Sequence, residues 1–431
     1  MLCSLMAGSL GYASRLSHRA VDELGGTLGA PELFDDGPAS SCPRVQRLVS
    51  LVLAAKKVVV HTGAGISTAC GVPDFRGPCG IWTLQAAGRP LPTASVEFSL
   101  ARPSYTHQAI LALHAAGKVS AIVSCNVDGL HLRSGLPRDC LFELHGNVFV
   151  EKCGRCGAEH VRDFEIPSVG FKKTGRRCAC GSELADTALD WEDPLPEDAL
   201  LGAEQHCRDA CLSLALGTSL RIQPANTLPS LTRKAGGRFA VVNLQPTPKD
   251  RGAAVVLRRR CDDVMREVLR AMSLRAPNFV RHDTLRVTHT CSGRGADGRL
   301  SLRLCVCSPH GDDCPVDWCA GLEVACAGAE FSVSGGAKRA REDDDAPLEP
   351  PVAPAAGGDA DGYVRIPGRA PWRFVCRAPA GSDEAVLSIR ATLAAACTEP
   401  PAVFAYVAAG GREAWGAGAE VRIKTVEVSY E

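Results

Sequence analysis

Short apolar runs recur between residues 44 and 275, and stretches with helical spacing lie between several of them. The stretch RVQRLVSLVLAAKK (44–57) repeats apolar residues at helical spacing and ends in lysines, which suit a helix C-terminus. Four runs have the character of buried strands and carry Gly, Asn, Ser or Thr toward their C-terminal side: VVVHTGAGIST (58–68), VSAIVSCN (119–126), CLSLALGTSL (211–220) and GRFAVVNLQ (237–245). The alternation predicts an α/β fold, with a doubly wound, Rossmann-like parallel sheet and helices on both faces. Ligands then bind outside the carboxyl ends of the strands.

Two stretches in the first part of the chain depart from this pattern. Residues 1–44 are rich in Gly, Pro, Ser and mixed charge, which predicts an irregular N-terminal arm before an α/β domain over 45–275. Residues 146–186 hold closely spaced cysteines and interrupt the strand–helix rhythm. We interpret this stretch as a small module inserted into the α/β domain.

The character of the chain changes again near residue 275. Alternating apolar and polar positions, as in LSLRLCVC (300–307), predict a C-terminal β-rich accessory domain made of residues 276–334 and 362–431. The stretch 335–361 between them is rich in Pro, Gly, Ala and Asp and cannot build a core, so it predicts a disordered linker.

Composition narrows the class of protein. The 431 residues are 45% hydrophobic and 22% charged with a net charge of zero, so overall charge gives no argument for binding nucleic acid. The 21 cysteines are scattered, many of them inside apolar runs, which favours free thiols over a disulfide framework. The N-terminus has no signal-peptide pattern, and no apolar run approaches the roughly 18 residues of a membrane span. We therefore expect an intracellular protein in a reducing compartment.

A glycine-rich turn, TGAGIS (62–67), follows the first predicted strand. Such a turn lets backbone N–H groups approach a diphosphate at a helix N-terminus. Thr68 stands where the dinucleotide fingerprint has its third glycine, and no acidic residue follows in a second strand, so a tight βα turn remains the alternative. The next segment, GVPDFRGPCGIW (71–82), adds Asp74, Phe75, Arg76 and Trp82 beside the turn.

Two cysteine pairs predict a zinc site. Cys153 and Cys156 have the common two-residue spacer, whereas Cys178 and Cys180 are separated by only one residue. Four thiolates can enclose a tetrahedral zinc ion, and such a closed site is structural because it leaves no open coordination position. Unmetallated thiols are the alternative. The tail cysteines, Cys291, Cys305, Cys307, Cys314 and Cys319, together with His310, match no metal-site spacing, and we expect them to be buried free residues.

Five motifs occur in a fixed order: GAGISTACGVPDFRG, CNVDGLHLRSGLP, ELHGNVF, GTSL and VVNLQPTP. This set resembles the sirtuins, NAD-dependent protein lysine deacylases, over about residues 30–275. The segments LGAPELFDD (28–36), DWEDPLP (190–196) and CDDVM (261–265) look like the nuclear class IV branch that contains the sixth and seventh mammalian sirtuins. The resemblance implies that 45–275 is a sirtuin catalytic domain, that NAD is a consumed cosubstrate and that zinc is structural.

The resemblance also implies roles for individual residues. The catalytic set would be His145 as general base, with Asn126 and Asp128 in the nicotinamide pocket; capping of a strand end is the alternative for Asn126 and Asp128. Trp191 would lie in the substrate groove, although an ordinary packed aromatic is nearly as good an interpretation. The NAD-binding set would be Gly63, Ala64, Gly65, Ile66, Thr68, Asp74, Phe75, Arg76, Trp82, Cys125, Gly217, Thr218, Ser219, Asn243, Gln245 and Cys261.

The implied reaction moves an acyl group from lysine to ADP-ribose and releases nicotinamide. The implied partners are acylated lysines of histone tails or other nuclear proteins, and chromatin that contains them. Two alternatives share the site: mono-ADP-ribosylation of proteins, and an NAD-responsive chromatin-binding module with little turnover. Cys125 supports the last, because the family has glutamine there and cysteine is a shorter, weaker hydrogen-bonding residue. The run KRAR (338–341) adds weak support for a nuclear location, since EDDD follows it and neutralises its charge.

Overall fold

A computed structural model describes residues 11–17, 27–90, 98–311, 314–327, 329–333, 363–366, 369–377, 384–394, 400, 402–409 and 419–430. The predicted linker 335–361 and the run KRAR lie outside the described residues. The chain forms two compact units, Met1–Phe279 with Val428–Glu431 and Val280–Glu427. Among the described residues, no helix has the length and apolarity that crossing a bilayer demands.

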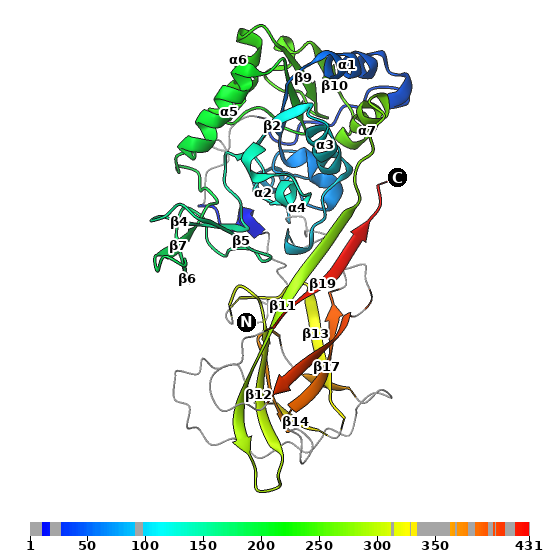
Figure 1. Ribbon diagram of the computed structural model, residues 1–431. Coiled ribbons are helices and arrows are strands. Elements are labelled where there is room, and N and C mark those ends of the chain that lie inside the picture. Colours follow the sequence, from blue (N-terminus) through cyan, green and yellow to red (C-terminus); the bar gives the residue numbers. More distant parts are fainter. Residues whose placement is uncertain are drawn as a thin grey trace. The chain divides into compact units, whose positions relative to one another are not determined.

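The first unit is built on a six-stranded parallel sheet, as the sequence predicts (Figure 1). In spatial order its strands are β10 (Val255–Leu257), β9 (Arg238–Val242), β8 (Leu212–Leu216), β1 (Val58–Thr62), β2 (Val119–Ser124) and β3 (Leu141–Glu143). The central strands are buried on both faces, which explains their continuous apolar runs.

Helices cover both faces of this sheet. On one face, α1 (Pro43–Ala54), α3 (Tyr105–Ala115) and α7 (Cys261–Ala271) pack against Val58 and Val60. On the other face, α5 (Glu197–Asp209) and α6 (Leu228–Lys234) pack against Val59, because successive side chains of a strand point to opposite faces. The short helices α2 (Ile81–Ala86) and α4 (Leu130–Arg133) follow the strand ends. The doubly wound α/β prediction is therefore confirmed.

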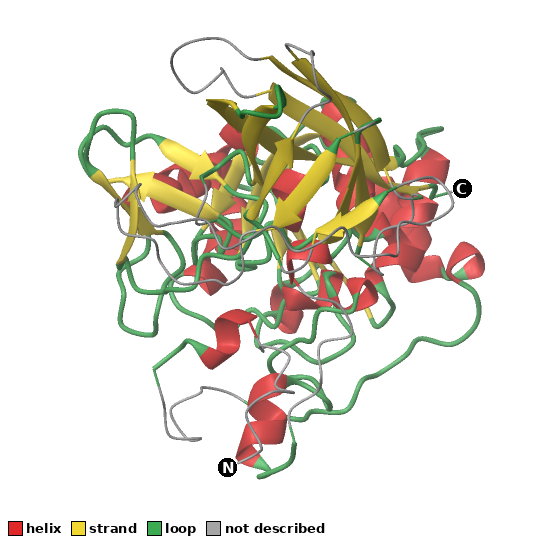
Figure 2. Cartoon of the chain, turned by 90° about the horizontal axis from the view of Figure 1, so that it is seen from below, coloured by secondary structure: helices red, strands yellow, loops and turns green. Residues whose placement is uncertain are grey.

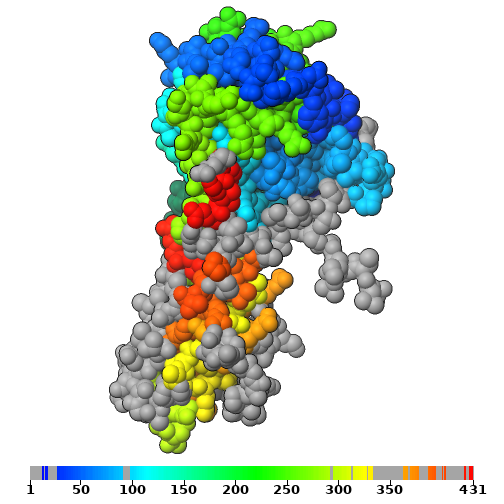
Figure 3. Space-filling view, turned by 90° about the vertical axis from the view of Figure 1, so that its right-hand side faces the viewer, coloured from blue at the N-terminus to red at the C-terminus, as the bar shows by residue number. Residues whose placement is uncertain are grey.

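Segments far apart in the sequence meet on the surface of this unit. Residues of the α1 region, coloured blue, lie beside green residues near α7 in the space-filling view (Figure 3), and α1 contacts both β10 and α7. The chain end also returns here, because Tyr430 donates a hydrogen bond to the carbonyl of Pro103 and packs edge-on against Tyr105. The last described residues thus belong to the α/β unit.

An antiparallel sheet interrupts the α/β pattern after β3. Its order is β5 (Glu159–Val161), β4 (Val150–Cys153), β7 (Glu183–Asp186) and β6 (Lys173–Arg177). Glu151 on β4 is fully buried and accepts hydrogen bonds from Arg162 Nε at 2.6 Å and Arg176 Nε at 2.7 Å. This ion-paired carboxylate links β4 to β6 and to the residue that follows β5. The end of β4 and the turns of the sheet carry all four cysteines of the predicted zinc site.

The described elements of the second unit are all β-strands, drawn yellow in Figure 2. One sheet has the order β14 (Glu330–Val333), β16 (Trp372–Arg377), β12 (Leu300–Cys307), β11 (Phe279–Arg294) and β19 (Ala419–Val428). The other has the order β15 (Val364–Ile366), β13 (Cys319–Ala325), β17 (Glu384–Leu393) and β18 (Ala402–Ala409). The alternation in β16, where Trp372, Phe374 and Cys376 are buried, explains the period-two pattern of the sequence.

Candidate active site

A cavity of about 430 Å³ lies in the first unit, where the carboxyl ends of β1, β2, β8 and β9 meet. Sixteen of the residues proposed from the sequence for catalysis, NAD binding or substrate binding line it: Gly63, Ala64, Gly65, Asp74, Phe75, Arg76, Trp82, Cys125, Asn126, His145, Trp191, Gly217, Thr218, Ser219, Asn243 and Gln245. The turns after the strands thus bring distant segments of the chain to one site, as the parallel sheet requires.

The glycine turn after β1 packs backbone against backbone on the turn after β8. Gly65 N donates to the Gly217 carbonyl at 2.9 Å, and Gly217 has a φ of +57°, a conformation that favours glycine. A Cβ atom added at Gly63 or Gly65 would lie 2.8 Å from atoms of the Gly217–Thr218 backbone. These glycines therefore close the rim between the two turns, a role that the sequence pattern does not reveal.

Asn126 lies on the cavity wall, and Asp128 lies behind it. Asn126 Nδ2 donates to the Gly63 carbonyl at 3.1 Å and to Ser67 Oγ at 3.3 Å, and Ser67 Oγ donates to Asp128 Oδ2 at 2.7 Å. Asp128 Oδ1 accepts from the Leu130 N–H, which opens α4. Asp128 is thus buried behind Ser67 and orients Asn126 indirectly.

His145 lies at the cavity with a defined tautomer. Its Nδ1 is 3.1 Å from the Cys125 carbonyl oxygen, which can only accept, so Nδ1 carries the proton and Nε2 is the basic nitrogen of the neutral ring. Burial, assisted by the positive charge of Arg76, lowers the pKa of His145, although the Cys125 carbonyl opposes this shift. The imidazole is therefore neutral at pH 7 and able to accept a proton. By contrast, His131 binds Thr62 Oγ1 in the interior.

Aromatic side chains and guanidinium groups occupy another part of the wall. Phe75 and Trp82 have ring centroids 4.6 Å apart, Trp191 lies 4.9 Å from Trp82, and Arg76 stacks over Trp82 at 4.4 Å. Burial, together with the charge of Arg221, lowers the pKa of Arg76 to about 10. Two guanidiniums that repel each other in one cavity suit a multiply charged anion, and a diphosphate has this charge. The residues present therefore fit NAD.

Cys125 lines the same cavity, half-buried at the end of β2. Burial raises the pKa of its thiol to about 12, although the positive charge of Arg76 opposes the shift. The side chain is therefore a neutral thiol at physiological pH, and it also packs against the apolar cluster of Val59 and Val123. It supplies neither a charge nor a strong hydrogen bond to the cavity.

Three residues of the proposed NAD set lie away from the cavity wall, as Asp128 does. Ile66 is part of the apolar core between the sheet and α1. Thr68 is exposed and donates back to the Gly65 carbonyl at 3.2 Å. Cys261 is buried at the start of α7, where its thiol lies 3.8 Å from the Val242 carbonyl. Motif position alone did not distinguish residues that face the cavity from residues that support the turns behind it.

The structure adds cavity residues that the sequence did not indicate. Arg221 directly follows the GTSL motif, and this position was the available signal. Tyr12 and Leu16 come from the N-terminal stretch for which the sequence predicts an irregular arm. Tyr12 Oη donates to the Leu189 carbonyl at 2.6 Å, and Ser17 N donates to Asp190 at 3.0 Å. Residues 11–17 therefore pack along the segment that contains Trp191. Their sequence has no periodic pattern that would predict this contact.

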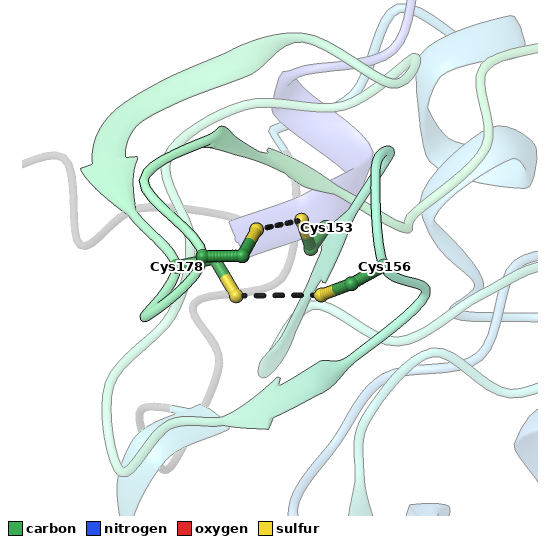
Figure 4. A group of neighbouring side chains, drawn as sticks. Cys153, Cys156 and Cys178 are labelled. Carbon is green, nitrogen blue, oxygen red and sulfur yellow. Dashed lines mark hydrogen bonds between the residues drawn. The ribbon is translucent and has the colours of Figure 1, made fainter.

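The four cysteines of the inserted sheet form one cluster (Figure 4). The Sγ atoms of Cys153 and Cys180 are 3.5 Å apart, those of Cys156 and Cys178 are 3.6 Å apart, and all four lie within 4.8 Å of one another. A tetrahedral zinc ion with Zn–S bonds near 2.3 Å requires sulfur atoms about 3.8 Å apart, so the cluster can hold one zinc ion. The one-residue spacer is thus compatible with a four-thiolate site.

Comparisons with known proteins identify the family of this chain. The sequence model of the Sir2 family matches residues 91–224. NAD-dependent protein deacetylase SRT1 of Arabidopsis thaliana is 46% identical over 320 residues, which cover 74% of this chain and 67% of that protein. NAD-dependent protein deacetylase Sirt6 of Drosophila melanogaster is 42% identical, with 63% and 87% covered, and sirtuin-7 of Homo sapiens is 39% identical, with 64% and 72% covered. The chain therefore belongs to the Sir2 family, as a sirtuin of the Sirt6 and sirtuin-7 type.

Proposed function

We propose that this chain is an NAD-dependent protein lysine deacylase, which transfers the acyl group of a modified lysine to ADP-ribose and releases nicotinamide. The observation that carries the proposal is the tautomer of His145, which leaves Nε2 as an unprotonated base in the cavity beside Asn126. NAD, when bound, supplies the electrophilic ribose carbon and the nicotinamide leaving group. The relatives named NAD-dependent protein deacetylases support the same activity.

Each group of residues that lines the cavity then has a role in the proposed reaction. His145 Nε2 takes a proton from a ribose hydroxyl, and burial keeps the ring neutral for this purpose. Asn126, held by Gly63 and Ser67, would bind the nicotinamide end of NAD through its amide, while Arg76 and Arg221 would hold the diphosphate. Phe75, Trp82 and Trp191 exclude water from the reacting groups. A zinc ion held by the four cysteines of the inserted module would have a structural role only, since four thiolates would leave no open coordination position.

We further propose that the acylated partner is a nuclear protein, with histone tails as the first candidates, and that the chain is located in the nucleus. The support is the likeness to Sirt6 and sirtuin-7 and to the nuclear branch that the motifs resemble. A second candidate activity, mono-ADP-ribosylation of proteins, would use the same cavity. Cys125 instead favours an NAD-responsive chromatin-binding module with little turnover, because it stands where the family has glutamine and a step that depends on that amide is weakened here.

The test is incubation of the full chain with NAD and acetylated or long-chain-acylated histone peptides, with both peptide and NAD products followed by mass spectrometry. Acyl-ADP-ribose supports deacylation, whereas ADP-ribosylated protein without it supports the second candidate. His145→Asn should abolish turnover. His114→Asn is a matched control, because His114 Nδ1 also lies 3.0 Å from a backbone carbonyl, that of Val119, but outside the cavity. NAD binding without NAD consumption would contradict both enzymatic proposals.

A further inference from the structure

The turn that carries His145 is fixed at its two edges by backbone contacts. On one side, Leu144 N donates to the Ser124 carbonyl at 2.9 Å and His145 Nδ1 donates to the Cys125 carbonyl. On the other side, Leu189 N donates to the His145 carbonyl at 3.1 Å. Gly146 has a φ of +75°, and a Cβ atom added there would lie 1.7 Å from the Thr187 carbonyl oxygen. The turn therefore has little room to move sideways.

A hydrogen bond between two buried side chains closes the same turn on its inner side. Glu143, the last residue of β3, is only 5% exposed, and its Oε1 accepts from Asn147 Nδ2 at 2.8 Å. Asn147 is 2% exposed, and its Oδ1 accepts from the Phe149 N–H at 2.9 Å. The bond from Glu143 to Asn147 joins the side chains of two residues that lie two positions before and two positions after His145. Together with the bond from Asn147 to Phe149, it anchors the turn to the strand that follows.

The second oxygen of Glu143 has an unusual environment. Oε2 is buried and accepts no hydrogen bond from the described residues. Arg138 Nη2 is 3.9 Å away, and the guanidinium of Arg138 instead binds Glu159 at 2.8 Å and 3.1 Å and the Leu141 carbonyl at 2.6 Å. A buried carboxylate is costly when one oxygen accepts no hydrogen bond and its ion pair is as long as 3.9 Å, whereas a protonated carboxyl group is not. The site therefore suits a neutral acid.

The groups that face Glu143 agree with this assignment. Burial raises the pKa of Glu143 to about 8, the nearby charges of Asp128 and Glu159 act in the same direction, and Arg138 and Asn147 oppose them. At pH 7 the side chain is then mostly uncharged and still accepts from Asn147. Above pH 8 it gains a charge in the interior, directly beneath the turn of His145.

We propose that Glu143 is a positioning residue for the reaction of His145: its buried carboxyl group, through Asn147, holds the turn that presents the imidazole to the cavity. This inference rests on the proposed deacylase function. It assigns Glu143 no contact with substrate or NAD, since Glu143 does not line the cavity.

Two variants separate positioning from simple stability. Glu143→Gln keeps an oxygen that accepts from Asn147 but cannot ionise, and Glu143→Leu fills similar space without an acceptor. We expect Glu143→Leu to lower kcat by about 10- to 100-fold with little change in KM for NAD, because small displacements of a catalytic group have such effects. Glu143→Gln should retain kcat at pH 7 and lose any decline of kcat near pH 8. Glu204→Leu is the matched control, because Glu204 pairs with Arg208 on the exposed face of α5.

A readout that needs no turnover keeps this inference distinguishable from the proposed function. Titration of His145 by NMR of carbon-13-labelled histidine should show its pKa shifted toward 6.5 in Glu143→Leu and unchanged in Glu143→Gln. Equal loss of kcat in both variants, or an unchanged kcat and His145 titration in folded Glu143→Leu, would overturn the inference. A wild-type chain that never consumes NAD would instead refute the proposed function, and the titration would still test the role of Glu143.

Discussion

Replacing Cys125 by glutamine should raise the turnover of this chain. The Cys125 thiol is neutral because burial raises its pKa to about 12, and its side chain is too short to project far into the cavity. Glutamine extends further and offers both a donor and an acceptor. Because Cys125 packs against Val59 and Val123, the longer side chain must turn into the open volume of about 430 Å³.

The size of the gain follows from one added hydrogen bond. A net contribution of about 0.5–1.5 kcal/mol in the transition state corresponds to about a 2- to 13-fold increase in kcat/KM. The increase should appear in kcat with NAD saturating, because the glutamine of the family contacts the nicotinamide ribose at which the reaction occurs. Initial rates with an acylated histone peptide, measured by chromatographic separation of the peptide products, provide the assay.

Cys125→Ser separates reach from polarity. Serine has a stronger hydrogen-bonding group than cysteine but does not reach further, so we expect it to change kcat/KM by less than about twofold. If Cys125→Gln leaves turnover unchanged while NAD binding and the melting temperature are preserved, the proposed defect does not exist. If Cys125→Ser raises turnover as much as Cys125→Gln does, the polarity of the side chain matters and its length does not.

Three further predictions concern zinc, pH and the diphosphate. Cys178→Ser should release one zinc ion per chain, measured by atomic absorption, and lower the melting temperature, whereas Cys211→Ser, at an exposed cysteine outside the cluster, should retain the metal. Since burial lowers the pKa of His145 and the base must be unprotonated, kcat/KM should stay constant as the pH falls through 7 and decline only below about 6.5; a decline centred above pH 7 would contradict this. Arg221→Ala should raise the Kd for NAD by about 10-fold in calorimetry, with Arg238→Ala on the exposed start of β9 as the control, and an unchanged Kd would remove Arg221 from the site.

The sequence predicted the α/β sheet, the cavity at the carboxyl ends of its strands and the cluster of four cysteines, because each depends on local patterns. Continuous apolar runs identify strands buried on both faces, and parallel strands place their polar ends at one edge. The predictions did not specify which side chains of a motif face the cavity and which lie behind its wall. Asp128 and Asn126 are two positions apart in one motif, yet only Asn126 reaches the cavity, because Ser67 from another turn lies between Asp128 and the wall.

The sequence also did not predict contacts between residues that are far apart in the chain. Tyr12 reaches the cavity through a contact with Leu189, which is 177 residues away in sequence. The sequence around neither residue has a periodic pattern that would predict this contact. The zinc ligands needed no long-range information, because the one-residue spacer between Cys178 and Cys180 still lets all four sulfur atoms lie within 4.8 Å of one another.

The contact of residues 11–17 with the segment that contains Trp191 leads to a prediction that a matched control variant can test. Arg15 donates to the Ile166 carbonyl at 2.6 Å and to Glu165 at 2.7 Å, and it holds residues 11–17, which bring Tyr12 to the cavity wall. The Arg15 side chain is 20% exposed, so we discount its charged hydrogen bonds to a net contribution of about 1 kcal/mol.

Arg15→Ala should therefore raise KM for the acylated peptide by about fivefold and leave the Kd for NAD unchanged, because the loss loosens the wall near Trp191 and not the glycine turn. Arg44→Ala is the control. Arg44 forms an ion pair of similar length, 2.6 Å, with Asp35, but its side chain is 55% exposed and does not line the cavity. Steady-state kinetics with each substrate varied in turn distinguish the two effects. An equal rise in KM for both variants would show that surface charge, and not the position of residues 11–17, governs peptide binding.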